Sequence, residues 1–495
     1  MRATSLRTLL LGGLGLLAAG CAAPVVPVEL PQISQTAGYR YGTLDRQAPK
    51  GLAQTAVLLS FSGGGTRAAA LSDGALRALA ETTVPTPVGP VPLASQIDVI
   101  SSVSGGSVTA AKFALDGIPG LDGFERGFLH ADAQGSMIAG ALLNPTKLVA
   151  PRIGILQSYL DDNVFDHHTY ADLIARDQPG AGRRPYIILN ATDMANGSQF
   201  SFTQDQFDLI CGDLAPLRVA DAVSASAAFP VALSALTLRN HAPCPAQDAA
   251  AASAKTGWES DDGRPVPSRV LDDHTAKALQ GVNYPSAQNL ARFRRGTEAL
   301  TYLNRYGKKD YVQLLDGGLA DNVGLTVPLI LLTSGSLSPS IQSWVNTGTV
   351  SNLLFVVVNA RSQDDNSYGS SPSPPGIVDT LLTTIGAPID ANSFQLVDQL
   401  TAAFDQRLKQ DAIVMVDFDF IKDFRCREHF HNIATSWALP GPQVDELIAL
   451  GRAMVLQAPR YQALVHALGG TAPPPGPTVD DICAPYASRP VAAVR

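Results

Sequence analysis

The first candidate for chemistry is Ser104, in the run Ser102-Val103-Ser104-Gly105-Gly106. The apolar run Ile97–Val103 before it predicts a strand, and the pattern from Gly105 to Leu115 predicts a helix. A serine nucleophile at such a junction needs small residues two positions before and two after it, because the backbone is strained and the helix packs close to the strand. Ser102 stands where the usual pattern has glycine, but it is small. A Ser-Gly-Gly turn that only caps a helix is the alternative.

A second candidate is Asp316, which could act as the base for this serine. It ends the apolar run Tyr311–Leu315 and is followed by Gly317 and Gly318. Glycines let the backbone turn sharply and leave the carboxylate at the end of the strand. A serine hydroxyl is a weak nucleophile until a base lies within hydrogen-bond reach. Taken alone, however, Asp-Gly is a common turn pair, and the motif then indicates only a tight turn.

A third candidate is the glycine-rich turn Ser62-Gly63-Gly64-Gly65-Thr66-Arg67, which follows the apolar run Val57–Phe61. Consecutive glycines allow several backbone N–H groups to point at one spot, and a helix N-terminus behind them adds positive potential. We therefore expect an anion or oxyanion here, with a plain structural turn as the alternative. A phosphate-binding loop is less favoured, because no Lys-Ser/Thr follows the glycines and Arg67 occupies the approach.

The elements that would position these motifs alternate between short apolar runs and helical patterns. A helical pattern, Arg67–Glu81, separates the first two runs, and the later runs of strand length are Tyr186–Leu189, Tyr311–Leu315, Leu353–Val358 and Ala412–Phe418. This rhythm predicts an α/β fold with a mostly parallel central sheet sandwiched between helices in three layers. Each motif follows a strand, where open α/β sheets place their binding sites.

As a set, the three motifs resemble the patatin-like phospholipase family. That family has a glycine-rich loop ending in arginine, then a Gly-x-Ser-x-Gly elbow, then a distant Asp-Gly-Gly, and the order is the same here. A fourth stretch, Ala222–Pro230, resembles the family's small-residue helix ending in proline. The resemblance covers about Thr55–Leu325 and implies the patatin-like three-layer fold.

The resemblance also implies a function. The chain would be a serine acyl-ester hydrolase of the phospholipase A or lysophospholipase type, with a dyad in which Asp316 takes the proton from Ser104 directly. The implied oxyanion donors are the backbone N–H groups of Gly63, Gly64 and Gly65. Arg67 is implied as a substrate-binding neighbour of the oxyanion or phosphate. No cofactor and no metal are implied, and no acidic loop has calcium-binding spacing.

A rival arrangement uses the histidine-rich segment Arg427–His431. The order Ser104, Asp316, then His429 or His431 matches the chain order of α/β-hydrolases and would give a Ser-His-Asp carboxylesterase acting on small esters. The same segment could ligate a metal. Histidines just beyond an edge strand are more commonly surface groups, so we favour the dyad. A non-catalytic envelope lipoprotein is the remaining alternative.

The N-terminus predicts secretion. Residues 1–20 combine two arginines with the apolar run Leu9–Ala19, which is shorter than the roughly 20 residues of a membrane helix. The ending Ala-Ala-Gly-Cys resembles a bacterial lipobox with Cys21 as the lipidated residue, and ordinary signal-peptidase cleavage is the alternative. Ala22 is not the aspartate of an inner-membrane retention signal. We expect a lipid-anchored protein of the cell envelope, in the outer membrane of a two-membrane bacterium.

Composition divides the rest of the chain. Residues 21–54 lack periodicity and are expected to be a tether. The hydrolase domain is expected over 55–440, with surface insertions near 241–294 and 361–376 that are rich in Ala, Asp, Ser and Pro. Residues 441–495 are expected to form a C-terminal helix and a Pro-rich tail.

Charge and cysteine content limit the partners. The chain has 36 basic and 44 acidic residues, a net charge of -8 and no basic run interleaved with aromatics, which excludes nucleic acid. Membrane lipid is expected as both substrate and anchor.

The four cysteines after Cys21 form up to two disulfides in one of three pairings, or stay as buried thiols; they are Cys211, Cys244, Cys426 and Cys483. Head group, acyl position and oligomeric state stay open.

Overall fold

The structure is a computed structural model. It describes residues 24–34, 37–40, 52, 54–143, 152–176, 185–230, 233–247, 290–304, 307–333, 347–362, 395 and 410–487. The expected signal peptide, Cys21 and most of both expected insertions lie outside these ranges.

The core is a mixed sheet of eight strands in the order β12-β11-β2-β5-β6-β10-β9, with β7 paired to β6. Its strands are β2 (Thr55–Phe61), β5 (Val99–Val103), β6 (Tyr186–Asp193), β7 (Ser198–Ser201), β9 (Leu236–Arg239), β10 (Tyr311–Asp316), β11 (Asn352–Asn359) and β12 (Gln410–Asp417). The five strands from β12 to β6 run parallel. At the other end, β10, β9 and β7 pair antiparallel. The predicted mostly parallel sheet flanked by helices is confirmed. The antiparallel strands at this end were not predicted from the sequence.

Helices precede and follow most of these strands. The longer ones are α3 (Gly65–Glu81), α4 (Gly105–Asp116), α6 (Ala133–Leu143), α8 (Arg152–Asn163), α14 (Leu290–Thr301), α20 (Gly441–Gln457), α21 (Pro459–Ala467) and α22 (Val479–Ala487). Shorter α-helices are α5 (Leu121–Phe124), α9 (Tyr170–Arg176), α10 (Gln204–Asp208), α11 (Val219–Ser226), α15 (Gly318–Asp321), α16 (Thr326–Thr333) and α19 (Phe424–His431). Single turns are η1 (Leu93–Gln96), η2 (Ile118–Gly120), η3 (Glu125–Leu129) and η5 (Phe418–Phe420), and small strands are β1 (Val28–Glu29), β3 (Thr83–Thr86), β4 (Gly89–Pro92) and β8 (Gly212–Asp213). In the part of the chain that is described, no helix combines the length and apolar character needed to cross a bilayer.

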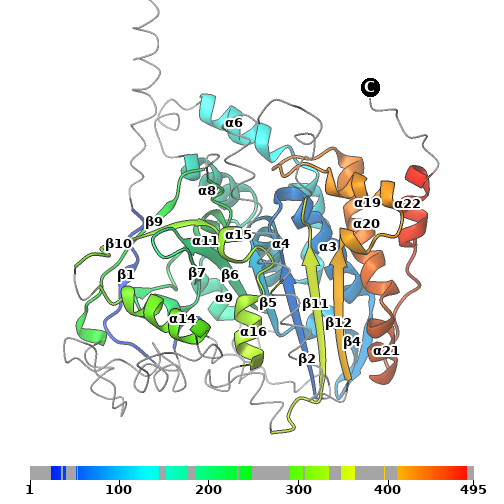
Figure 1. The fold of residues 1–495 in the computed structure, drawn as a ribbon, viewed down its shortest axis with the longest axis horizontal. Coiled ribbons are helices and arrows are strands. Elements are labelled where there is room, and N and C mark those ends of the chain that lie inside the picture. Colours follow the sequence, from blue (N-terminus) through cyan, green and yellow to red (C-terminus); the bar gives the residue numbers. More distant parts are fainter. Residues whose placement is uncertain are drawn as a thin grey trace, which may run out of the picture.

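The two ends of the sheet carry different parts of the chain. Figure 1 shows the C-terminal helices α19 to α22 gathered beyond the β12 edge, whereas β9, β10 and β1 lie at the opposite end. The glycine-rich turn and the predicted elbow leave the middle strands, β2 and β5. The candidate residues are therefore held by the centre of the sheet.

Helix α20 packs closely against α3 through two glycines. A Cβ atom on Gly74 would lie 2.1 Å from the carbonyl oxygen of Ile448, and one on Gly451 would lie 2.2 Å from that of Leu71. Since real Cβ atoms do not approach so closely, only glycine permits this packing. Helix α20 thereby fixes the position of α3, whose first turn belongs to the glycine-rich loop.

Part of the expected tether, residues 21–54, is bonded to the domain instead. The backbone of Val25 donates to one residue of β9 at 2.8 Å and accepts from another at 2.9 Å. Further on, β1 pairs antiparallel with β8. Backbone groups at a sheet edge bind a neighbouring segment whatever its side-chain pattern, so the lack of periodicity did not predict this contact.

Two disulfides resolve the open pairing of the four cysteines. Cys211 is bonded to Cys244, and Cys426 is bonded to Cys483. The first joins the turn between α10 and β8 to the segment after β9, and the second joins α19 to α22. The C-terminal tail is thus covalently attached to the folded domain over its described residues.

Candidate active site

Ser104 occupies a strained turn between β5 and α4, as the elbow motif predicts. Its φ of 51° and ψ of -121° lie where residues with a Cβ atom are seldom found. The glycines that follow are required by close packing: a Cβ atom on Gly105 would lie 2.0 Å from the carbonyl oxygen of Gly65, and one on Gly106 would lie 2.6 Å from that of Ser62. The glycine-rich loop therefore packs directly on the elbow.

Asp316 reaches Ser104 from an antiparallel strand. On β10, Asp316 pairs with Ala191 of β6, and the preceding residue of β6, Asn190, pairs with Val103 of β5. Because β10 ends at this register, its last residue lies level with the residue that follows β5. The sequence predicted the position of this carboxylate at a strand end but not the direction of the strand.

The Asp316 carboxyl group is buried beside the Ser104 side chain, which favours its ionised form. The Gly318 amide donates to the carboxylate at 2.8 Å. Burial raises the pKa of Asp316 to about 6, although the Gly318 amide and the Ser104 side chain both act to lower it. Such a group is ionised at neutral pH and is a stronger base than an exposed carboxylate, which suits proton abstraction from a hydroxyl.

The glycine-rich loop lies beside this pair. A Cβ atom on Gly63 would lie 3.4 Å from the Cβ atom of Ser104. The Gly63 amide donates to the carbonyl oxygen of Asn322 at 3.0 Å. This amide is expected to bind the oxyanion, but in the structure it already has an acceptor. The amides of Gly64 and Gly65, at φ of 140° and 58°, donate to no acceptor among the described residues. They are the open donors at the start of α3.

Arg67, which is expected to bind substrate, is bonded to the protein backbone behind the loop, and its contact with substrate stays a prediction. Its side chain is buried, and its Nε donates to the carbonyl oxygen of Ala360 at 2.9 Å while Nη1 donates to that of Ile433. Burial lowers the pKa of Arg67 to about 10. Because Nε and Nη1 both donate to backbone carbonyls, Arg67 joins the start of α3 to the end of β11 and to the segment after α19.

Two supporting residues were not predicted from the sequence. The hydroxyl of Ser226, the last residue of α11, accepts from the backbone amide of Ser104 at 2.9 Å. The hydroxyl of Thr192 on β6 donates to the carbonyl oxygen of Asp316 at 2.8 Å. The small-residue stretch Ala222–Pro230 drew attention to α11, but a run of small residues does not show which hydroxyl forms these bonds.

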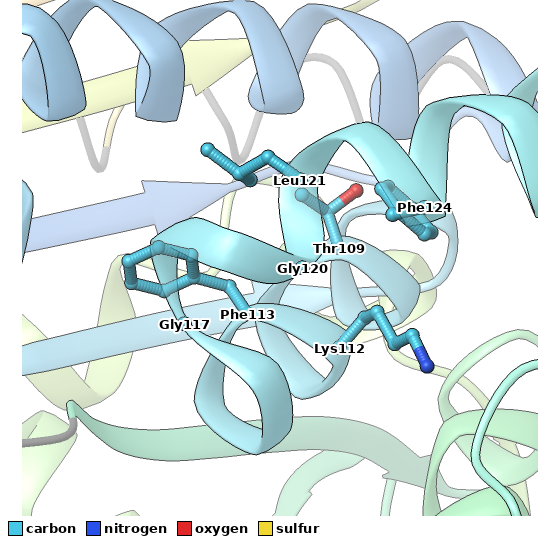
Figure 2. A pocket seen from close by; sticks show the side chains of 7 residues that line it. All are labelled: Thr109, Lys112, Phe113, Gly117, Gly120, Leu121 and Phe124. Carbon is cyan, nitrogen blue, oxygen red and sulfur yellow. The ribbon is translucent and has the colours of Figure 1, made fainter.

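A shallow hollow lies near the C-terminal end of α4 and contains neither Ser104 nor Asp316 (Figure 2). Its lining combines aromatic and aliphatic side chains with one lysine: Thr109, Lys112, Phe113, Gly117, Gly120, Leu121 and Phe124. It therefore offers nothing to the reacting pair.

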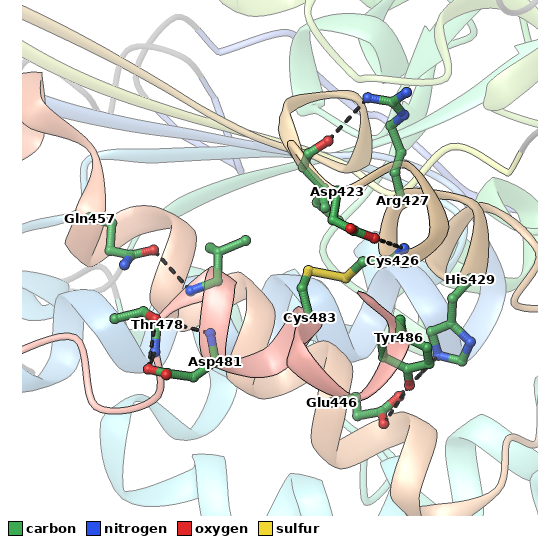
Figure 3. Close-up of a disulfide and its surroundings, with 12 residues drawn as sticks. Asp423, Cys426, Arg427, His429, Glu446, Gln457, Thr478, Asp481, Cys483 and Tyr486 are labelled. Atoms are coloured by element: carbon green, nitrogen blue, oxygen red, sulfur yellow. Dashed lines mark hydrogen bonds and ion pairs between the residues drawn. A yellow bond between two sulfur atoms is a disulfide. The ribbon is translucent and has the colours of Figure 1, made fainter. Parts of the chain in front are cut away.

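His429 belongs to a cluster near the C-terminus. Its Nε2 lies 3.1 Å from a carboxylate oxygen of Glu446 and 2.9 Å from the hydroxyl of Tyr486, whose ring stacks on the imidazole. Figure 3 shows this cluster beside the disulfide between α19 and α22. The ring thus joins α19 to α20 and α22.

His431 is also engaged elsewhere. Its Nε2 lies 3.0 Å from a carboxylate oxygen of Asp419, and its Nδ1 lies 3.2 Å from the carbonyl oxygen of Arg361. Within the described ranges, no hydrogen bond joins either histidine to Ser104 or Asp316. The geometry gives the Ser-His-Asp alternative no support.

Comparison with known proteins agrees with this geometry. Residues 59–255 match the family model described as patatin-like phospholipase. They belong to the patatin-like phospholipase family. The matched part of the patatin-like domain contains the glycine-rich loop, the elbow and α11 but ends before Asp316. The aspartate is therefore assigned from its contact with Ser104.

Among solved structures, the chain is similar to human GIVD cytosolic phospholipase A2, with 12% sequence identity and a TM-score of 0.39. The alignment covers 86% of this chain and 64% of that chain, so this chain spans less than two thirds of the length of the human protein. No curated protein sequence matches the chain.

The raised pKa of Asp316 predicts that Asp316→Asn stabilises the fold at neutral pH. An unfolded aspartate releases its proton near pH 3.8 but the folded one only at about 6, so ionisation between these values favours the unfolded state. The cost to the wild type is up to about 3 kcal/mol above pH 6. Asparagine stays neutral and can still accept from Gly318. Thermal unfolding should show a higher midpoint for the variant near pH 8 and a much smaller difference near pH 4.

Asp321→Asn is the contrasting variant. Asp321 is equally buried, but its two carboxylate oxygens accept from the amides of Gly324 and Thr326 at 2.9 and 2.6 Å. Asparagine keeps one acceptor oxygen, but its NH2 group cannot accept. One of the two bonds is therefore lost, so this variant should be less stable than wild type at both pH values. If Asp316→Asn lowers the midpoint near pH 8 as well, the carboxylate of Asp316 is not a desolvated charge.

Proposed function

We propose that this chain is a serine acyl-ester hydrolase acting on lipids, of the phospholipase A or lysophospholipase type, with Ser104 as nucleophile and Asp316 as its base. The observation that carries the proposal is the placement of the buried Asp316 carboxyl group at the end of β10, level with the turn that holds Ser104, where the Ser104 side chain favours the ionised carboxylate. The match of residues 59–255 to a phospholipase family supports a lipid ester as substrate.

The reaction begins with proton transfer from the Ser104 hydroxyl to the Asp316 carboxylate as the serine oxygen attacks the ester carbonyl carbon. A base that already lies beside the hydroxyl needs little rearrangement to accept its proton. Because the pKa of Asp316 is raised to about 6, the base is ionised at neutral pH and holds a proton more readily than an exposed aspartate.

The negative oxygen of the tetrahedral intermediate needs donors in place before the reaction. The amides of Gly64 and Gly65 are suited to this because both are unengaged among the described groups and stand at the N-terminus of α3. The Gly63 amide would first have to release the carbonyl oxygen of Asn322. We assign the oxyanion to the first two donors.

Two further steps complete the cycle. The ester C–O bond breaks, Asp316 returns the proton to the departing alcohol, and the acyl group remains on Ser104. Water then attacks the acyl carbon, gives a proton to Asp316 and releases the fatty acid, after which Ser104 regains its proton. One residue acts in turn as base and acid.

The proposal includes a lipid anchor at Cys21 in the outer membrane of a two-membrane bacterium, so that membrane lipid is both anchor and substrate. Its support is the lipobox-like ending before Cys21 and the contact between Val25 and β9. A segment of four residues reaches at most about 14 Å. An acylated Cys21 would hold the β9 edge of the domain within that distance of the bilayer surface.

Hydrolysis assays test the dyad. We expect Ser104→Ala and Asp316→Asn each to lose about 10³-fold or more in kcat/KM, because each removes half of the reacting pair. Wild type, both variants and the controls Ser95→Ala and His429→Ala are assayed on phosphatidylcholine vesicles, lysophosphatidylcholine and a short-chain p-nitrophenyl ester. The two controls should retain wild-type rates.

Each contrary result has a meaning. Activity that survives Asp316→Asn but is lost in His429→Ala would replace the dyad with a histidine-dependent site. Folded wild type that hydrolyses none of the three esters would make the chain a binding protein. Hydrolysis of only the short-chain ester would remove lipid from the proposal.

Membrane fractionation tests the anchor. In a two-membrane bacterium that expresses the full chain, we expect wild type in the outer-membrane fraction and labelled by a palmitate analogue, because the cysteine carries the acyl chains. Cys21→Ser should be unlabelled and lost from that fraction. Labelled Cys21→Ser, or unlabelled wild type in the soluble fraction, would contradict the anchor.

A further inference from the structure

Ser226 lies at a junction between the two halves of the candidate dyad. Its hydroxyl accepts from the Ser104 amide at 2.9 Å, donates to the carbonyl oxygen of Asn190 at 2.6 Å and lies 3.0 Å from the hydroxyl of Ser107. All of these groups are buried. One hydroxyl on α11 thus contacts the elbow, the first turn of α4 and the central strand β6.

The direction of these hydrogen bonds is fixed by their chemistry. A carbonyl oxygen can only accept, so the single proton of the Ser226 hydroxyl is directed to Asn190. Its lone pairs are then free to face the Ser104 amide, which can only donate. The hydroxyl cannot turn away without leaving a buried donor and a buried acceptor unpaired.

The backbone around Ser226 holds the other half of the pair. The carbonyl oxygen of Ser226 accepts from the Gly317 amide at 3.0 Å, and the carbonyl oxygen of Ala228 accepts from the Asp316 amide at 3.0 Å. The end of α11 is therefore bonded to the Asp-Gly-Gly turn through its backbone and to Ser104 through one side chain. A shift of either half relative to the other would break one of these bonds.

We propose that Ser226 is a positioning residue that holds Ser104 in its strained conformation and in register with Asp316. Ser104 keeps a positive φ of 51°, a conformation that persists only where the surroundings impose it. Its amide has a single acceptor among the described residues, the Ser226 hydroxyl. The inference rests on the proposed function, because it assumes that Ser104 is the nucleophile.

The same helix offers a matched control. Ser224 is two residues earlier in α11 and equally buried, yet its hydroxyl has no hydrogen-bond partner among the described groups. Ser226→Ala and Ser224→Ala therefore remove the same atom from the same helix. Only the first breaks a bond to the nucleophile.

Steady-state kinetics and labelling by a fluorophosphonate probe test the role on the full chain. We expect Ser226→Ala to lower kcat about 100-fold with KM nearly unchanged, since displacement of a reacting group by about 1 Å costs a factor of this size. The rate of fluorophosphonate labelling should fall in parallel. Ser224→Ala should match wild type in kcat, KM and labelling rate, and Ser226→Thr, which keeps the hydroxyl, should recover most of the loss.

The outcomes separate this inference from the proposed function. If wild type and Ser224→Ala are both labelled and Ser226→Ala is labelled as fast, Ser226 does not position Ser104. If folded wild type is neither labelled nor active, the nucleophile itself is wrong. Should Ser226→Ala not fold, Ser226→Cys fills the space with a weaker acceptor, and a kcat equal to that of wild type would then overturn the inference.

Discussion

The approach of the Ser104 side chain to the buried Asp316 carboxyl group is the contact on which the rest of the site depends. It places a hydroxyl against a carboxylate that burial keeps only weakly acidic, with a pKa of about 6. Moving such a charge out of water costs free energy, and the fold offsets only part of that cost with the Gly318 amide. A residue maintained at this cost is typical of a reacting group.

The surrounding structure restricts how Ser104 can move. The glycine-rich loop lies so close that no side chain fits at Gly105. Arg67, just after this loop, donates hydrogen bonds to two backbone carbonyls of distant segments. Helix α20 packs closely against α3, which begins in the loop. On the other side, α11 bonds to both the elbow and the Asp-Gly-Gly turn. These contacts keep the proposed nucleophile, the proposed base and the open amide donors in one arrangement.

The sequence predicted the parts of this arrangement that depend on local chemistry. The strand-turn-helix around Ser104, the mostly parallel sheet and the glycine-rich turn all follow from apolar runs and glycine positions. Contacts set by tertiary packing were not predictable. Arg67 was expected at the substrate but donates to carbonyls of distant segments, and the antiparallel direction of β10 is decided by its partners β6 and β9. The bond of Ser226 to Ser104 spans 122 residues of sequence, and no spacing rule reveals it.

The most direct test of the account is the pH dependence of fluorophosphonate labelling at Ser104, which reports the nucleophile without regard to substrate class. The dyad predicts that the second-order rate constant of wild type falls as pH drops, with a midpoint at about 6, because the carboxylate must be ionised to accept the proton. Asp316→Asn should be labelled far more slowly and without that midpoint. A wild-type profile that is unchanged in Asp316→Asn would contradict the central claim.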